Sequence, residues 1–300
     1  MKNFVIHLGI GRTGTTFLQD IFFCDLHKKK LINYIDNKST YYKQFKDLIY
    51  SDNEIYSKNK KNKILKKLIT DNNILNLISD ETLLPFKHQQ ISFGLFYSRL
   101  FEIFDNPQVV ITVREQKSAI VSYYLSNHYI VNNKYISFSD FFDKLNSQNF
   151  NFRYISLLKY KNIFGYFLEN KRNLSILVYE EMKKQDNYIS KWFEILNIDN
   201  YNYDLKINNK TTNNTTSLVF NYRKIVYSYK IFKYFHSFLS YFFKIIGYDF
   251  NKFILSFKGS SKVIYLTKNQ KDTLDKLYEP HNKYLQNNFG INLKNFNYKI

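Results

Sequence analysis

The sequence is poor in the residues and patterns that mark several large protein classes. Its single cysteine, Cys24, excludes a disulfide bond within the chain. Its longest uncharged apolar run, 234–243, is well short of the roughly 18 residues that a membrane-spanning helix needs. The first ten residues contain no secretory signal, because their apolar stretch is too short. We therefore expect a cytoplasmic protein without disulfide bonds or spanning helices.

Acidic residues are also few, at 25 against 44 basic residues, which gives a net charge of +19. A surplus spread along the whole chain is typical of a solvated surface. It also suits a polyanionic ligand such as a nucleotide, an acidic glycan or a membrane face. The length of 300 residues is enough to bury a substantial core, and the aromatic content of 19% argues against disorder. The composition indicates a basic, folded protein.

Glycine is scarce too, and three of the eight glycines, Gly9, Gly11 and Gly14, fall within six residues. They follow a short apolar run, 4–8, and precede an apolar-periodic stretch, 15–24. Glycine is needed where a backbone turns tightly and brings its N–H groups up to an anion. The pattern predicts a strand, a phosphate-binding loop and a helix. An ordinary strand–turn–helix without a ligand is the alternative.

The loop differs from the nucleoside-triphosphatase type, in which lysine follows the second of two spaced glycines. Gly9 and Gly14 have that spacing, but Thr15 occupies the lysine position. The cation, Arg12, lies earlier in the loop. This arrangement resembles the 5′-phosphosulfate loop of sulfotransferases that use 3′-phosphoadenosine 5′-phosphosulfate (PAPS), whose pattern is close to G-x-x-K-(S/T)-G-T-T-x-L-Q. The sequence matches this pattern at Gly9, Thr13, Gly14, Thr15, Thr16, Leu18 and Gln19, and departs from it at Arg12.

The resemblance implies which loop residues bind PAPS and which one stabilises the reaction. Arg12 stands where lysine is the commoner residue in the family, and its guanidinium would stabilise negative charge on the leaving group. Because arginine hardly gives up its proton, a lysine's role in protonating the leaving group is not available here. The PAPS-binding residues that the resemblance implies in this loop are Gly11, Arg12, Thr13, Gly14, Thr15 and Thr16.

A second predicted strand, 74–79, is followed directly by two acids, Asp80 and Glu81. In open α/β sheets, ligands bind just beyond the carboxyl ends of the strands. The resemblance implies that Glu81 is the base that takes the proton of the acceptor hydroxyl. His88 is the alternative base, and His128 is a further candidate. Alternatively, the two acids only start a helix, where the helix dipole favours negative charge.

All five residues of a third predicted strand, 109–113, are β-branched, and Arg114 follows at its carboxyl end. Ser122 follows eight positions later, in the next predicted helix. This spacing resembles the family's site for the ribose 3′-phosphate, which an arginine and a serine hold together. An arginine paired with a carboxylate and a tolerated mid-helix serine are the alternatives. Late in the chain, Lys210 lies in a polar loop that the resemblance implies closes over the nucleotide.

The remaining patterns complete an α/β fold. A last central strand is predicted over 174–179, ending at two further acids, Glu180 and Glu181, which we interpret as structural. We predict a three-layer fold of the P-loop nucleotide-binding type, in which helices flank a parallel sheet. One domain should span 1–300, with a mainly helical part over 218–300. Predicted helices cover 41–50, 61–70, 92–105, 187–197 and 272–290.

The stretch 218–257 is the least typical, since it combines many aromatic and aliphatic residues with lysine and arginine. Basic residues alternating with aromatics suit a helix lying on an anionic membrane. They equally suit helices packed on a globular core, with lysine stems lying along the apolar surface. Peripheral contact with the inner membrane face is therefore one of two open interpretations.

The resemblance implies an enzyme that transfers the sulfuryl group of PAPS to a hydroxyl, leaving 3′-phosphoadenosine 5′-phosphate (PAP). The composition, the expected cytoplasmic location and a glutamate base favour a carbohydrate acceptor in a glycan or glycolipid. We expect no metal, because the lysine that precedes a magnesium-binding hydroxyl is absent. We also expect no nucleic-acid partner. A P-loop phosphotransferase and a non-catalytic protein that binds a nucleotide or an anionic glycan are the alternatives.

Overall fold

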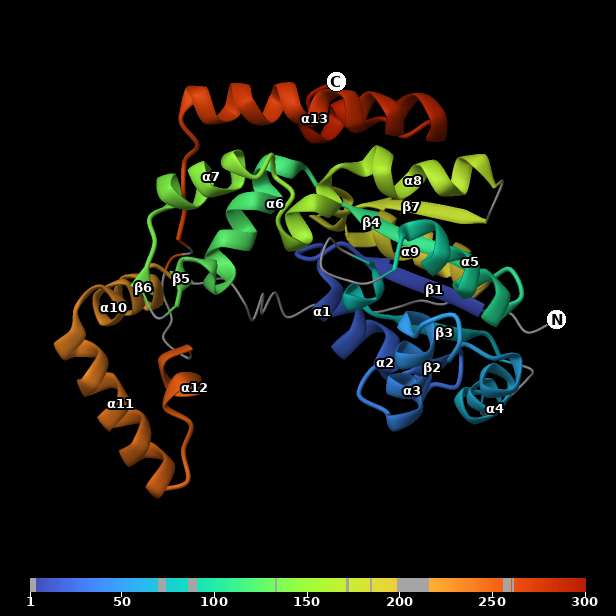
Figure 1. The fold of residues 1–300 in the computed structure, drawn as a ribbon, viewed down its shortest axis with the longest axis horizontal. Helices are drawn as coiled ribbons and strands as arrows, with labels where there is room; N and C mark the ends of the chain where they lie inside the picture. The colour runs from blue at the N-terminus through green and yellow to red at the C-terminus, as the bar shows by residue number, and fades with distance from the viewer. Residues whose placement is uncertain are drawn as a thin grey trace. The chain divides into compact units, whose positions relative to one another are not determined.

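The computed structural model describes residues 4–69, 74–85, 91–132, 134–170, 173–183, 185–198, 216–255, 260 and 262–300. Its ribbon is drawn in Figure 1. The chain divides into two compact units, each built from separate stretches of sequence. The first unit comprises 1–116, 151–203 and 274–300, and the second comprises 117–150 and 204–273. That the chain forms one domain stays a prediction.

A five-stranded parallel sheet forms the centre of the first unit, in the order β2-β3-β1-β4-β7. In the register of the sheet, His7 of β1 lies beside Ser79 of β3, and Gly9 of β1 lies beside Thr112 of β4. All six residues of β1 are buried, as expected for a central parallel strand covered on both faces. The predicted α/β fold is confirmed. The strands are β1 (Phe4–Gly9), β2 (Asn33–Ile35), β3 (Asn76–Ser79), β4 (Gln108–Val113) and β7 (Leu174–Val178).

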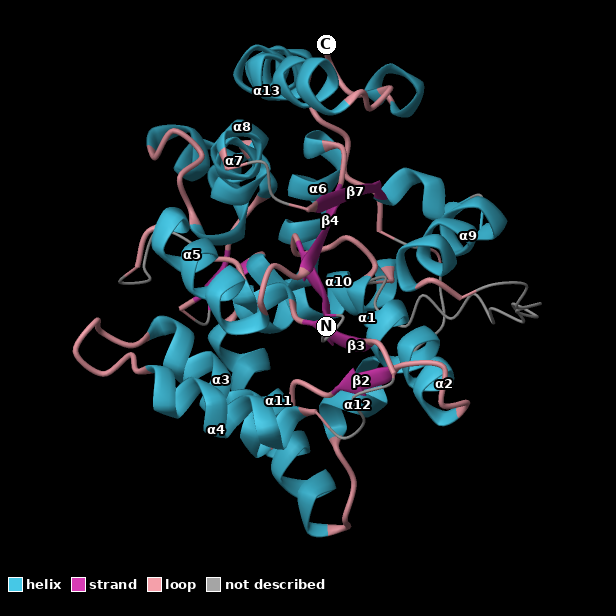
Figure 2. Cartoon of the chain, turned by 90° about the vertical axis from the view of Figure 1, so that its right-hand side faces the viewer, coloured by secondary structure: helices cyan, strands magenta, loops and turns pink. Residues whose placement is uncertain are grey.

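Helices cover both faces of this sheet, as Figure 2 shows. On one face, the Phe4 ring of β1 lies 4.5 Å from the Phe104 ring of α5. On the other face, the His7 ring of β1 lies 5.1 Å from the Trp192 ring of α9. Alternate residues of one strand therefore contact different helix layers. The helices are α3 (Thr40–Tyr50), α5 (Phe93–Phe104) and α8 (Tyr160–Glu169) on the first face, and α2 (Phe23–Lys28) and α9 (Gln185–Leu196) on the second.

Serine side chains begin three of the helices that precede β4. Ser39, Ser57 and Ser92 accept hydrogen bonds from the backbone amides three residues later. These bonds satisfy amides that have no acceptor within the helix. The helices they begin are α3, α4 (Lys58–Leu68) and α5, which confirm three predicted helices.

The structure differs from the predicted elements at three places. The strand β7 lies at the outer edge of the sheet rather than in its centre, and its first three residues are only half-buried. The short edge strand β2 was not predicted. The helix after the glycine loop is continuous but changes type, because a π-helical turn, Leu18–Phe22, separates the first turn, Thr15–Phe17, from α2.

The second unit is mainly helical. A two-stranded antiparallel hairpin, β5 (Ile130–Val131) with β6 (Lys134–Tyr135), is its only described sheet. Its aromatic core includes Tyr129 and Phe220, whose rings lie 4.8 Å apart. In the described part of the chain, no helix combines the length and apolar composition that crossing a membrane requires. The helices are α6 (Gln116–Tyr123), which begins in the first unit, α7 (Phe138–Ser147), α10 (Ser217–Ser228), α11 (Lys230–Ile245) and α12 (Phe250–Leu255).

Candidate active site

Four strand ends meet at one edge of the sheet in the first unit. The glycine loop with the first residues of its helix, 10–16, follows β1, and Glu81 lies two residues after the end of β3. Arg114 follows β4, and Tyr179 follows β7. Because all five strands are parallel, these groups come from the same, carboxyl edge. This is the edge at which open α/β sheets bind their ligands.

The glycine loop is bent by two residues with left-handed backbone, Arg12 with φ 75° and Gly14 with φ 77°. A Cβ atom at Gly14 would lie 2.7 Å from the Met182 sulfur, so a larger residue would also meet a neighbouring element. A Cβ atom at Gly9 would lie 2.2 Å from the Thr15 methyl carbon. Packing therefore favours glycine at both spaced positions of the pattern, and at Gly14 the left-handed backbone favours it as well.

The threonines of the loop have different surroundings. The Thr13 hydroxyl is buried and donates a hydrogen bond to the Ile10 carbonyl oxygen at 2.6 Å, which ties the loop to itself. The predicted ligand contact of Thr13 therefore rests on its backbone amide. Thr16 is exposed at the start of the helix. The amides at the first turn of a helix have no acceptor within the helix, and they can donate to an anion there.

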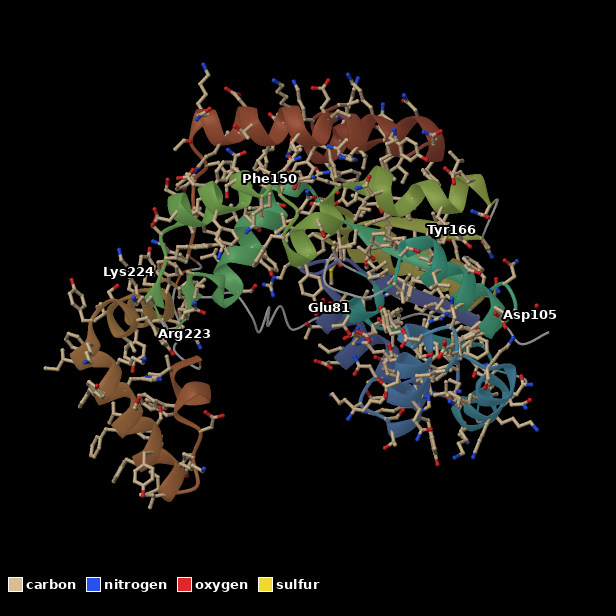
Figure 3. The ribbon with its side chains drawn as sticks, viewed as in Figure 1. Glu81, Asp105, Phe150, Tyr166, Arg223 and Lys224 are labelled. Atoms are coloured by element: carbon tan, nitrogen blue, oxygen red, sulfur yellow. The ribbon has the colours of Figure 1, made fainter. Side chains whose placement is uncertain are left out.

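Glu81 contacts the glycine loop directly, because the Thr15 hydroxyl donates a hydrogen bond to its carboxylate at 2.9 Å. It stands at the start of a 3₁₀ turn, η2 (Glu81–Leu83), and is labelled in Figure 3. Asp80 has a different role. Its buried carboxylate accepts hydrogen bonds from the Thr82 amide at 2.7 Å and from the Tyr42 hydroxyl at 2.6 Å. Capping, the alternative interpretation of the two acids, is thus correct for Asp80.

Arg114 joins the end of β4 to the same loop. Its guanidinium donates a hydrogen bond to the Arg12 carbonyl oxygen at 2.6 Å and lies over the Tyr179 ring, 4.5 Å from the ring centre. Its backbone is held by Tyr160, whose hydroxyl accepts from the Arg114 amide at 3.0 Å and donates to the Arg114 carbonyl oxygen. The predicted phosphate-binding arginine and the loop are therefore adjacent.

The charges at this edge act on the Arg12 guanidinium. Burial and the positive charge of Arg114 lower the pKa of Arg12, whereas the Glu81 carboxylate and Tyr179 raise it. Arginine stays protonated at any physiological pH, so the site holds two guanidinium groups near one carboxylate. A bound anion would offset the repulsion between the two cations. The electrostatics thus favour a negatively charged ligand.

The loop after β4 is fixed by residues from much later in the chain. The Glu180 carboxylate accepts hydrogen bonds from the Glu115 amide at 3.0 Å and from the Tyr298 hydroxyl at 3.1 Å. Gln116 and Asn282, on α6 and on α13 (Lys268–Phe289), exchange two side-chain hydrogen bonds of 2.5 and 3.2 Å. The structural interpretation of Glu180 is confirmed. Tyr298 and Tyr160 were not predicted, because no local pattern marks their contacts.

A buried polar chain lies beneath the site. His7 of β1 hydrogen-bonds through Nδ1 to the Ser79 hydroxyl at 2.8 Å and through Nε2 to the Thr112 hydroxyl at 3.1 Å. Burial lowers the pKa of His7 to about 3, so the ring is neutral near pH 7. The Gln19 side chain, from the family pattern, donates to the Ser79 carbonyl oxygen at 3.1 Å. The three central strands and the loop helix are thereby connected. The one sequence signal was a histidine within an apolar run.

The remaining predicted site residues stay predictions. His88 and Lys210 lie outside the described residues, as does the side chain of His128. Ser122 is half-buried on α6 in the second unit, and its pairing with Arg114 stays a prediction. Within the described residues, no three histidine, cysteine or acidic side chains gather as a metal site would require.

Comparisons with known proteins identify the chain's relatives. A family model described as "Sulfotransferase domain" matches residues 3–286. Among solved structures, the chain is similar to the crystal structure of a sulfotransferase from Alicyclobacillus acidocaldarius, with 11% sequence identity and a TM-score of 0.51. That match covers 99% of this chain and 98% of the other. At this identity, it shows a common fold alone. No curated protein sequence matches the chain.

Proposed function

The chain belongs to the sulfotransferase domain family, and we propose that it transfers the sulfuryl group of PAPS to a hydroxyl of a carbohydrate. Glu81 is the proposed base, and the glycine loop with Arg114 is the proposed PAPS-binding site. Membership of the family supports sulfuryl transfer in general. That the donor is PAPS, that the acceptor is a carbohydrate and that Glu81 is the base is our proposal.

One observation carries this proposal, namely that the glycine loop contacts both other candidate groups. Thr15 donates to the Glu81 carboxylate at 2.9 Å, and Arg114 donates to the Arg12 carbonyl oxygen at 2.6 Å. The candidate base, the loop and the phosphate-binding arginine come from the ends of three adjacent strands. Such an arrangement fits a ligand with two separate anionic groups next to a reacting hydroxyl.

The proposed reaction forms a bond between the acceptor oxygen and sulfur while the bond from sulfur to the bridging phosphate oxygen breaks. The proton of the acceptor hydroxyl passes to the Glu81 carboxylate. Negative charge grows on the bridging oxygen, where the Arg12 guanidinium and the backbone amides of 14–16 would stabilise it. Arg114 would bind the 3′-phosphate and so hold the donor in register. Ser122 and Lys210 are proposed to contact phosphate as well, on the family pattern.

Thr15 gives the proposal a specific coupling between donor and base. A threonine hydroxyl has one proton to donate, and here it donates to Glu81. If the hydroxyl turned toward a bound phosphate, the Glu81 carboxylate would gain a vacant lone pair for the proton of the acceptor. Donor binding would then prepare the base. His88 stays the alternative base.

Two features support the acceptor and location that we propose. A glutamate base and a basic surface suit a glycan or glycolipid hydroxyl, and we propose a cytoplasmic protein that contacts the membrane face through 218–257. The net charge of +19 is compatible with both. We propose that no metal takes part, because the phosphate loop lacks the lysine that precedes a magnesium-binding hydroxyl.

Calorimetry with PAP, without metal, tests the donor site. We expect micromolar binding to the intact chain and roughly hundredfold weaker binding to Arg114→Ala, because a charge-assisted pair with phosphate is lost. Arg114→Lys should bind with an intermediate affinity, since lysine keeps the charge but not the planar fork. The matched control is Arg99→Lys. The buried Arg99 guanidinium donates to the carbonyl oxygens of Ile49 and Ser51, so this change should lower stability but not affinity for PAP.

ATP, with and without Mg²⁺, provides the opposing measurement. Weaker binding of ATP than of PAP supports the proposal. A preference for ATP with Mg²⁺ would instead favour the phosphotransferase alternative. PAP binding together with failure of every hydroxyl acceptor to be sulfated would favour a non-catalytic protein.

A further inference from the structure

The helix α11 presents an apolar face to solvent in the second unit. No residue of α11 is buried. Its outward residues are large and apolar, with Ile231 exposed by 74%, Phe238 by 64% and Ile245 by 66%. We define the α11 face as Ile231, Phe235, Phe238, Phe242 and Ile245, all of which are exposed. An exposed patch of this kind marks a binding surface, because isolated apolar residues rather than rows of them are normal on a monomer.

A neighbouring side of α11 is packed, which fixes the direction of this face within its unit. Leu239 and Phe243 pack against a small core of Val219, Phe250 and Ile254. The Phe243 and Phe250 rings lie 4.9 Å apart. Turning the α11 face inward would therefore expose Leu239 and Phe243 in its place.

The charges of the helices α10 and α11 have one sign. Residues 217–248 contain five basic residues, including Arg223 and Lys224 of α10, and no acidic residue. These two are labelled in Figure 3. At about 3.6 residues per turn, the lysines of α11 (Lys230, Lys233 and Lys244) fall on one arc of the helix, beside the α11 face. A single-signed border indicates a partner with negative charge.

Tyrosines lie between the lysines and the apolar face. On the same helical projection, Tyr234 and Tyr241 lie between the lysine arc and the apolar residues Phe238 and Ile245. The Lys230 ammonium lies 5.9 Å from the centre of the Tyr234 ring. Tyr234 and Tyr241 are exposed by 65% and 66%. A sequence of charged, amphipathic and apolar side chains around one helix matches the change from phosphate headgroups to acyl chains at a membrane surface.

We infer that the α11 face binds the surface of a membrane that contains anionic lipids, with the helix lying parallel to the membrane plane. Lipid phosphate complements the lysine arc, and acyl chains cover the phenylalanines and isoleucines. A second copy of the chain is a poorer occupant, because two such faces would bring lysine arcs of the same sign together. If the proposed function holds, this surface keeps the enzyme beside lipid-linked glycan acceptors.

Flotation with lipid vesicles tests the inference on the full chain. We expect it to float with vesicles of phosphatidylcholine and phosphatidylglycerol but not with phosphatidylcholine alone. The double variant Phe235→Glu, Phe238→Glu should reduce flotation at least about tenfold, because it places carboxylates in the apolar face. The control variant Val263→Glu, Tyr265→Glu adds the same charges at exposed residues outside α11 and should float normally. Higher salt should weaken binding, by about fivefold for each lysine contact that is lost.

The outcomes separate this inference from the proposed function. Calorimetry with PAP on the same proteins shows whether the variants are folded, and it reports the donor site independently of lipid. Flotation that is absent, independent of anionic lipid or unchanged in the α11 variant would overturn the inference. So would a dimer, detected by ultracentrifugation, that only the α11 variant dissociates, since a second copy would then cover the face. Flotation without PAP binding would uphold the inference and overturn the proposed donor.

Discussion

The two compact units use the same kinds of residue in opposite ways. In the first unit, Phe45 of α3 is fully buried and its ring lies 5.2 Å from the Phe104 ring. In the second unit, Phe238 of α11 is 64% exposed. Both helices are amphipathic, yet α3 directs its one phenylalanine to a core, whereas α11 packs Phe243 against a core and exposes Phe235, Phe238 and Phe242. Composition alone therefore does not tell a core face from a binding face.

The difference indicates how work is divided between the units. The first unit surrounds a charged edge with satisfied polar groups, such as the Glu180 carboxylate with its two donors. That edge suits a small, highly charged ligand. The α11 face offers area and apolar character instead, which suits an extended surface. Changes in one region should therefore leave the property of the other intact, and this independence can be tested.

Replacing the proposed base should give the largest effect. We expect Glu81→Gln to lower kcat for sulfuryl transfer about a thousandfold, because the amide cannot accept the proton of the hydroxyl. PAP affinity should change little, and vesicle flotation should not change. A rate assay with a sulfate donor, paired with flotation, checks both. An active Glu81→Gln protein would move the proposal to His88. Loss of flotation in this variant would show that the two regions are not independent.

Truncating one phenylalanine in each region measures the comparison directly. Phe45→Ala should lower the free energy of unfolding by about 3–5 kcal/mol, because it leaves a cavity in the core. Phe238→Ala should change it by no more than about 0.5 kcal/mol, because the ring is exposed. Urea denaturation followed by circular dichroism provides both values. Equal losses would mean that the α11 face is packed against protein in solution.

Removing the Thr15 hydroxyl should have the smallest effect on catalysis, but it tests a single hydrogen bond. Thr15→Val keeps the branched shape beside Gly9 but removes the hydrogen bond to Glu81, and we expect kcat/KM to fall about tenfold. Thr15→Ser keeps the hydroxyl and should stay within about twofold of the intact protein. Steady-state kinetics on both variants makes the measurement. A larger loss in the serine variant would assign the role of Thr15 to packing rather than to hydrogen bonding.

Much of the first unit could be predicted because its strands are short apolar runs that end at chemically distinctive residues. The glycine loop, Glu81 and Arg114 all follow such runs, and the parallel sheet brings them to one edge. The strand β2 escaped prediction because it has only three residues. It depends on pairing with β3, which a hydrogen bond of 2.7 Å between the Asn33 and Asn76 side chains supports.

The remaining contacts depend on distances that sequence patterns do not contain. Two adjacent acids, Asp80 and Glu81, look alike in the sequence. Only the folded chain shows that Tyr42 and the turn engage Asp80 while Thr15 engages Glu81. The fate of 218–257 was also undetermined, since aromatic and basic residues at helical spacing fit a packed helix and an interfacial one equally.

The hydrogen bonds that hold the loop after β4 also determine when the site can form. Gln116 meets Asn282 across 166 residues of sequence, and Glu180 meets Tyr298 across 118. During synthesis, the strands of the sheet leave the ribosome long before these partners do. The residues that follow Arg114 are therefore held by partners that emerge much later, so a growing polypeptide completes its sheet before the loop after β4 is fixed.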